Sequence, residues 1–129
     1  MDYWIGIDIG TTSTKAIAVS SKGEIKGIAS REYPLLSSQP RSAEQDPEVI
    51  FSAVLHSVQD VIQRANLSRQ EIAAIGIGSA MHSLIVMGAD HRPLSRSMTW
   101  ADSRSVDQVE QLKRSEIGAR IYQNTGTPL

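Results

Sequence analysis

The chain has 129 residues, 40% of them hydrophobic and 21% charged, a length that suits one domain with a core of its own. Thirteen basic and fourteen acidic residues give a net charge of −1 with no block of like charge, which argues against nucleic acid or an anionic membrane as the main partner. A small molecule fits this charge balance better. The absence of cysteine excludes disulfides and thiolate metal sites.

The first predicted element is a β-strand over Tyr3–Ile9, where isoleucines alternate with other residues in the period of a strand. Asp8 therefore points away from the isoleucine face. A tight turn follows, because Gly10 can adopt backbone angles that are closed to other residues. The turn offers main-chain N–H groups and hydroxyls from three residues, Thr11, Thr12 and Ser13.

This turn can form a concave anion site from its amides. Asp8 beside it can serve a magnesium ion, which keeps several waters and takes only one or two protein carboxylates. Lys15 would add a positive charge if its side chain turned toward bound phosphates. The alternative is an ordinary β-hairpin in which Asp8 is simply solvated, and both interpretations stay open on these residues alone.

Two more strands are predicted over residues 14–20 and 24–33, so the first third of the chain forms an antiparallel meander. Residues 34–45 are polar and irregular. Asp46 is a candidate N-cap, and Pro47 suits the first helical position. The apolar spacing beyond it predicts a helix from Pro47 to about Ala65 with one face on the sheet. That face comprises Ile50, Val54, Val58, Val61 and Ala65, flanked by Phe51, Leu55 and Ile62.

A fourth strand is predicted over residues 72–77, after a turn in which Ser68 and Glu71 have capping-box spacing. Because it follows a helix that follows strands, it should join in parallel and give a mixed α/β sheet. Residues 84–87, with a turn at 88–90, indicate a further strand. Two short helices are expected, one capped by Ser103 or Ser105 and running to about residue 113, and one over 116–122.

The last residues, 125–129, have the character of a loop that leads into another element, so we expect the chain to be a fragment. An isolated fragment would expose apolar faces, which predicts poor solubility or self-association. The alternative is a standalone binding or structural domain, which a stable, monodisperse monomer would favour.

Four segments occur in an order and spacing that together are specific: GIDIGTTSTK at 6–15, AEQDP at 43–47, GSAMHS at 78–83 and TWADSRS at 99–105. With them, the whole chain resembles the N-terminal part of the FGGY carbohydrate kinases and looks most like a gluconokinase or xylulokinase. The resemblance implies an α/β fold of the ribonuclease H-like, actin-like ATPase type, a mixed sheet with packed helices. Residues 1–129 would form an incomplete first domain, and ATP would lie between it and an absent second domain.

The resemblance also implies roles for individual residues. Asp8 should organise magnesium and its waters, and the ATP phosphates should be approached by Gly10, Thr11, Thr12, Ser13 and Lys15. Met81 and His82 match the substrate-contacting pair, although a core methionine and a hydrogen-bonded histidine at a strand end are the alternatives. The family's W-x-D-x-R signature falls on Trp100, Asp102 and Arg104. The alternative for this signature is structural. The tryptophan would pack under a loop, and an Asp/Arg ion pair would hold that loop in place.

The family's catalytic base is an aspartate well downstream, so the resemblance implies that it lies outside these 129 residues, as do the adenosine pocket and the rest of the sugar site. We therefore expect an ATP-dependent sugar or sugar-acid kinase as the parent protein and an inactive fragment. Gluconate is the best candidate substrate, and xylulose or another sugar is the alternative.

An actin-like or Hsp70-like ATPase switch is the competing class, because it shares a D-x-G-T-T core. The AMHS and TWADSR segments have no evident role in such a switch. A cytoplasmic location is expected, because Asp2 leads directly into a strand without a leader or transmembrane span. A homodimer is an open expectation for the parent.

Overall fold

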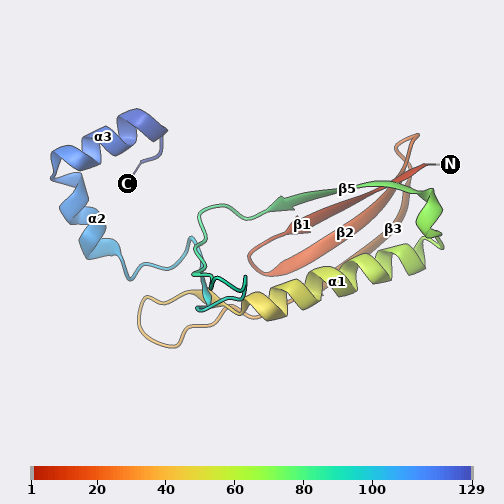
Figure 1. The fold of residues 1–129 in the computed structure, drawn as a ribbon, viewed down its shortest axis with the longest axis horizontal. Helices are drawn as coiled ribbons and strands as arrows, with labels where there is room; N and C mark the ends of the chain where they lie inside the picture. Colours follow the sequence, from red (N-terminus) through yellow and green to blue (C-terminus); the bar gives the residue numbers. More distant parts are fainter. Residues whose placement is uncertain (1, 129) are drawn as a thin grey trace.

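The computed structural model describes residues 2–128, and its centre is a four-stranded sheet with a long helix on one face (Figure 1). The strands lie in the order β3-β2-β1-β5. Their bounds are Tyr3–Ile9 for β1, Ser13–Ser20 for β2, Ile25–Glu32 for β3 and Ile72–Ser79 for β5. The first three form the predicted antiparallel meander, and β5 joins β1 in parallel, so the predicted mixed sheet is confirmed.

The long helix, α1, spans Pro47–Arg64 and begins as predicted, because the Asp46 carboxylate accepts a hydrogen bond from the N–H of Glu48 at 2.9 Å. The predicted inward face is largely confirmed, since Val61 and Ala65 are buried and Val54, Val58 and Ile62 pack against the core. The prediction missed Ala53 and Ser57, which are also buried. Small residues suit these positions because α1 lies close to the sheet. At Gly27 of β3, a Cβ atom would come within 3.3 Å of the backbone nitrogen of Ala65.

The core lies between α1 and the inner face of β1, β2 and β3, and is built from small and branched residues. Its buried members are Ile5, Ile7, Ala16, Ala18, Ala29, Val61 and Ala65. Cover by α1 stops before β5, where Ile75 and Ile77 are 52% and 67% exposed. The opposite face of the sheet is open and carries Asp8.

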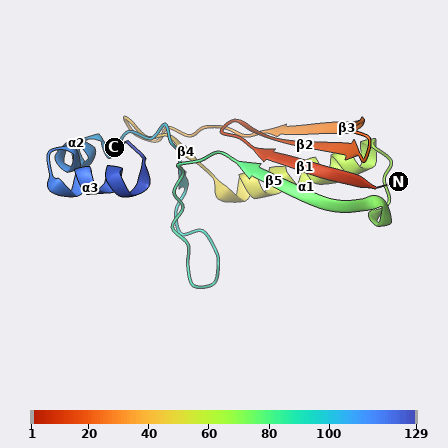
Figure 2. The ribbon, with the colours of Figure 1, turned by 90° about the horizontal axis from the view of Figure 1, so that it is seen from above.

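A second, two-stranded sheet lies beyond the end of the first and pairs β4 (Glu44–Gln45) with β6 (Ser97–Met98). It was not predicted, because two residues are too short to show a period. The strand predicted over residues 84–87 is wrong. That segment forms one side of an arm that projects from the body (Figure 2), with isolated bridges at Leu84 and Met87 only. Its apolar residues favour a strand, but in the described part of the chain only Leu84 pairs with a strand, at Met98 of β6, and all four residues stay exposed.

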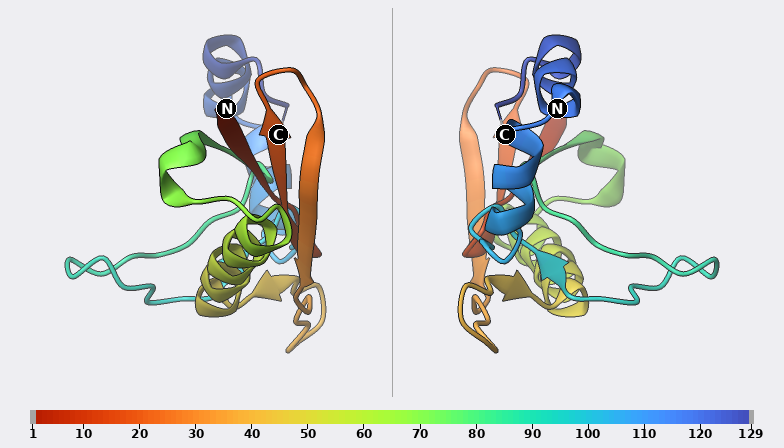
Figure 3. Two further views of the ribbon diagram at one scale, coloured as in Figure 1. Left: turned by 90° about the vertical axis from the view of Figure 1, so that its right-hand side faces the viewer. Right: turned by 90° about the vertical axis from the view of Figure 1, so that its left-hand side faces the viewer.

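The remaining elements agree with the sequence. A single 3-10 turn over Arg69–Glu71 carries the predicted capping box of Ser68 and Glu71. Helices α2 (Val106–Lys113) and α3 (Glu116–Thr125) contact each other at one end of the molecule (Figure 3). Among the helices between residues 2 and 128, none combines the length and the hydrophobicity that a bilayer crossing needs.

Candidate functional site

The turn between β1 and β2, residues 10–13, is called the phosphate loop below. It is closed by a hydrogen bond from the Gly10 N–H to the Ser13 carbonyl oxygen at 2.9 Å. Asp8 precedes it and Lys15 follows it, and these two residues are opposite each other across the strand pair. Both side chains are exposed on the open face of the sheet. A carboxylate and an ammonium group therefore stand beside the loop.

Three consecutive carbonyl groups of the phosphate loop are tied to protein donors. The Tyr33 hydroxyl donates to the Gly10 carbonyl oxygen at 2.7 Å, and the Gln45 side-chain amide donates to that of Thr11. The Tyr33 N–H donates to the Thr12 carbonyl oxygen at 3.1 Å. Within residues 2–128, by contrast, the N–H groups of Thr11 and Thr12 form no hydrogen bond. Free successive amides are what an anion-binding concavity requires.

Four of the five residues predicted to serve the substrate line one cavity of about 760 Å³. These are His82, Trp100, Asp102 and Arg104, and the fifth, Met81, is 71% exposed and is not part of that lining. His82 has a φ of 61°, in the left-handed region that few residues other than glycine adopt. Such a backbone conformation persists only where the surroundings impose it, and it is frequent at ligand sites.

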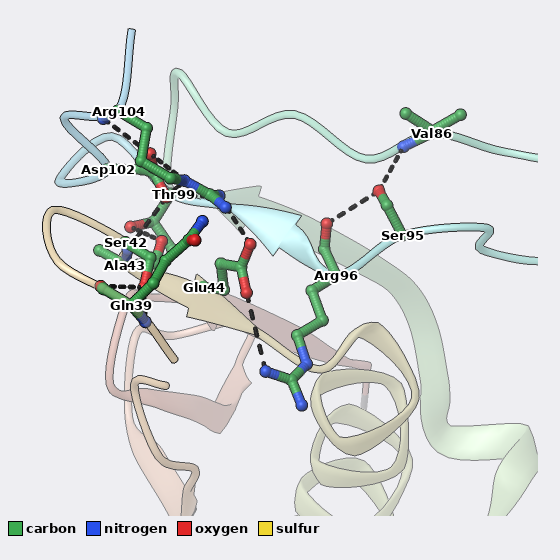
Figure 4. A network of polar contacts seen from close by, with 10 residues as sticks. All are labelled: Gln39, Ser42, Ala43, Glu44, Val86, Ser95, Arg96, Thr99, Asp102 and Arg104. Atoms are coloured by element: carbon green, nitrogen blue, oxygen red, sulfur yellow. Dashed lines mark hydrogen bonds and ion pairs between the residues drawn. The ribbon is translucent and has the colours of Figure 1, made fainter. Parts of the chain in front are cut away.

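Asp102 and Arg104, which line this cavity, form a network with Glu44 (Figure 4). The Arg104 guanidinium donates to both Asp102 carboxylate oxygens at 3.0 Å and to Glu44 Oε1 at 2.6 Å. The Ala43 N–H donates to Asp102 at 3.0 Å, and Arg96 lies 3.7 Å from the other Glu44 oxygen. The network thus joins the AEQDP and TWADSRS segments.

The hydrogen bonds and charges of this network shift the pKa values of Asp102 and Arg104. Hydrogen bonds from Arg104, followed by that from the Ala43 N–H, lower the pKa of Asp102 to about 2. The same carboxylate, together with Glu44, raises the pKa of Arg104 above its ordinary value. The Arg104 guanidinium is therefore bonded to both carboxylates, those of Asp102 and Glu44. This agrees with the alternative in which Asp102 and Arg104 form a structural ion pair.

Trp100 connects the cavity with the phosphate loop. Its indole N–H donates to the Thr11 hydroxyl oxygen at 3.1 Å, while 64% of the residue remains exposed. One residue therefore contacts the loop and lines the cavity at the same time. The phosphate loop and the cavity are consequently adjacent.

The carboxylate beside the loop fits a magnesium ion that keeps most of its waters. No group of three or more His, Cys, Asp or Glu side chains between residues 2 and 128 is arranged to hold a metal ion. Asp8 alone would be the protein ligand, and water and phosphate oxygens would complete the shell, as is usual for this ion.

The sequence left three contributors to the site without a role, namely Tyr33, Glu44 and Gln45. Glu44 and Gln45 belong to the AEQDP segment, which was a signal that this stretch matters. Tyr33 stood at the end of a predicted strand and carried no such signal.

Comparison with known proteins decides the family. The model of the FGGY family of carbohydrate kinases, N-terminal domain, matches residues 3–129. The chain belongs to this family. As an FGGY family member, it is 41% identical over 127 residues to a gluconokinase of Bacillus subtilis (strain 168), an alignment that covers 98% of this chain and 24% of that protein.

Two solved structures from Lactobacillus acidophilus are similar to this FGGY chain. A gluconate kinase matches with a TM-score of 0.91 and 38% identity, over 98% of this chain and 25% of the other. A ligand-bound xylulose kinase matches with a TM-score of 0.88 and 37% identity, over 95% and 24%. The predicted actin-like ATPase fold is thereby confirmed, and the chain spans about a quarter of the relatives it matches.

Proposed function

We propose that the protein containing this chain transfers a phosphoryl group from ATP to a hydroxyl group of a sugar or sugar acid. The observation that carries the proposal is the phosphate loop, whose Thr11 and Thr12 amides are free beside Asp8 in a member of a carbohydrate kinase family. Phosphoryl transfer depends mainly on positioning and electrostatic stabilisation, which such a loop supplies.

On the phosphate side, Asp8 would hold magnesium and its waters, and the bound ion would neutralise phosphate charge. The phosphates would be approached by Gly10, Thr11, Thr12, Ser13 and Lys15. Amides that are already free and oriented need no rearrangement when charge develops in the transition state. The base that accepts the proton of the substrate hydroxyl is expected outside these 129 residues, so the chain alone is proposed to be inactive.

On the substrate side, the proposal gives His82 and Trp100 direct contacts and leaves Met81 at the rim. Asp102 and Arg104 would shape the wall, since their charged groups are engaged with each other and with Glu44. Gluconate is the best candidate, because a gluconokinase and a gluconate kinase are among the relatives. Its carboxylate needs a donor. With Arg104 already paired, His82 is the candidate donor.

Xylulose is the second candidate substrate. The xylulose kinase structure is as similar to this chain as the gluconate kinase structure, at 37% against 38% identity. A neutral sugar would need hydrogen-bonding groups but no partner for a carboxylate. Gluconate would therefore need His82 as a donor to its carboxylate, whereas xylulose would not.

A substrate panel tests the proposal on the full-length protein. ATP turnover with gluconate, xylulose and glycerol should be highest for gluconate, and a strong preference for a neutral sugar would refute that choice. His82→Asn should raise KM for gluconate, and asparagine is the suitable replacement because it tolerates the left-handed backbone. Turnover with none of these acceptors would count against a sugar kinase. Sugar-dependent turnover by the purified 129-residue chain would refute its inactivity.

A further inference from the structure

Two buried polar side chains behind the phosphate loop have no role in the proposed chemistry itself. Tyr33 and Gln45 are 6% and 5% exposed. They come from different parts of the chain, one following β3 and the other ending β4 immediately before α1. Both also line a small cavity of about 220 Å³ whose other walls are mainly apolar.

Each of these side chains donates a hydrogen bond to a main-chain carbonyl oxygen of the loop. The Tyr33 hydroxyl reaches the Gly10 carbonyl oxygen at 2.7 Å, and the Gln45 amide reaches the Thr11 carbonyl oxygen. A peptide plane has its C=O and the following N–H on opposite sides. Fixing the carbonyls of Gly10 and Thr11 on the inner side therefore directs the N–H groups of Thr11 and Thr12 outward.

We propose that Tyr33 and Gln45 are positioning residues that hold the phosphate loop with its amides turned toward the nucleotide. The inference rests on the proposed ATP-dependent function. Neither side chain would touch a phosphate. Both act through the peptide planes, and their low exposure keeps water from competing for the Gly10 and Thr11 carbonyls.

The test uses full-length protein with Tyr33→Phe and Gln45→Met, which preserve size and remove the donor. One net hydrogen bond corresponds to a change of about three- to tenfold in an equilibrium constant. We expect each variant to weaken binding of magnesium ADP by about that factor in calorimetry, and to raise KM for ATP similarly. KM for the acceptor sugar should stay within about twofold, because the substrate cavity is unchanged.

Val61→Ala is the matched control. The Val61 side chain is completely buried in the core under α1 and has no polar atom that could bond to the loop. This variant should lower the melting temperature without changing nucleotide affinity. Circular dichroism shows whether each variant is folded, and Tyr33→Phe decides the matter if Gln45→Met does not fold.

The outcomes separate this inference from the function on which it rests. Wild-type protein that binds no nucleotide would overturn the proposed function and this inference with it. Wild-type protein that binds, with folded Tyr33→Phe or Gln45→Met binding equally well, would overturn the positioning role alone. Equal loss of affinity in Val61→Ala would also overturn it, since the effect would then follow general destabilisation.

Discussion

Removing one methylene group at a covered and at an uncovered position of the sheet measures how much stability the contact with α1 provides. Ile5 and Ile75 are register partners on β1 and β5, so their side chains lie on the same face of the sheet. Ile5 is completely buried under α1, whereas Ile75 is 52% exposed. The same substitution, isoleucine to valine, therefore removes the same group from a covered and from an uncovered site.

The burial difference sets the expected magnitudes. Ile5→Val should lower the free energy of unfolding by about 1 kcal/mol, because it combines lost transfer energy with a small cavity. Ile75→Val should cost about 0.4 kcal/mol, roughly half of the ~0.8 kcal/mol for a fully buried methylene, and it leaves no enclosed cavity. Urea denaturation of the purified 129-residue chain measures both values, at a protein concentration low enough to keep the chain monomeric and with the slope unchanged between variants.

Equal losses at the two positions would refute the reasoning. Either α1 would not cover Ile5 as described, or Ile75 would be covered in solution by another molecule. Repeating the titration at a tenfold higher protein concentration separates these cases, because self-association makes the apparent stability depend on concentration.

Three further outcomes are expected. Ser57→Ala should stabilise the chain by about 1 kcal/mol in the same titration, because the buried Ser57 hydroxyl forms no hydrogen bond within residues 2–128, and a loss of stability would contradict this. The pKa of Asp102 is lowered to about 2 in the folded chain, so its ionised form stabilises the fold fully above about pH 4, and this contribution is lost as the pH falls toward 2. Asp102→Asn should therefore flatten the acid limb of stability followed by circular dichroism, and an unchanged limb would exclude the pairing with Arg104. In sedimentation velocity, the isolated chain should self-associate through uncovered apolar surface such as Ile75 and Ile77, and a monodisperse monomer would contradict that expectation.

Local signals sufficed for most of the fold. The alternation in Tyr3–Ile9 and the Asp46-Pro47 pair each depend on neighbouring residues, so the sequence predicts the meander and the start of α1 well. Ala53 and Ser57 were harder to predict as part of the inward face of α1, because their own hydrophobicity does not mark them as buried. For residues 84–87, strand propensity was misleading because only Leu84 pairs with a strand, the two-residue β6, and the segment stays exposed.

The residues of the candidate site likewise fall into those that the sequence predicts and those that it does not. Asp8 and the phosphate loop follow from one contiguous segment, and His82 and Trp100 from segments that resemble a family. Tyr33 and Gln45 could not be found in this manner, because their importance lies in which carbonyl each one meets, and that is decided by the packing of β3 and β4.

The hydrogen bond between Trp100 and Thr11 also bears on the order in which the chain folds. It joins residues 89 positions apart, whereas Tyr33 and Gln45 reach the loop from 23 and 34 positions away. Contacts that close long segments form late, because the entropy of closure must be met before they stabilise anything. The phosphate loop should thus reach its final structure in two stages, and the hydrogen bond from the Trp100 indole to Thr11 should form last. Fluorescence of Trp100 in a Trp4→Phe background would follow that second stage directly.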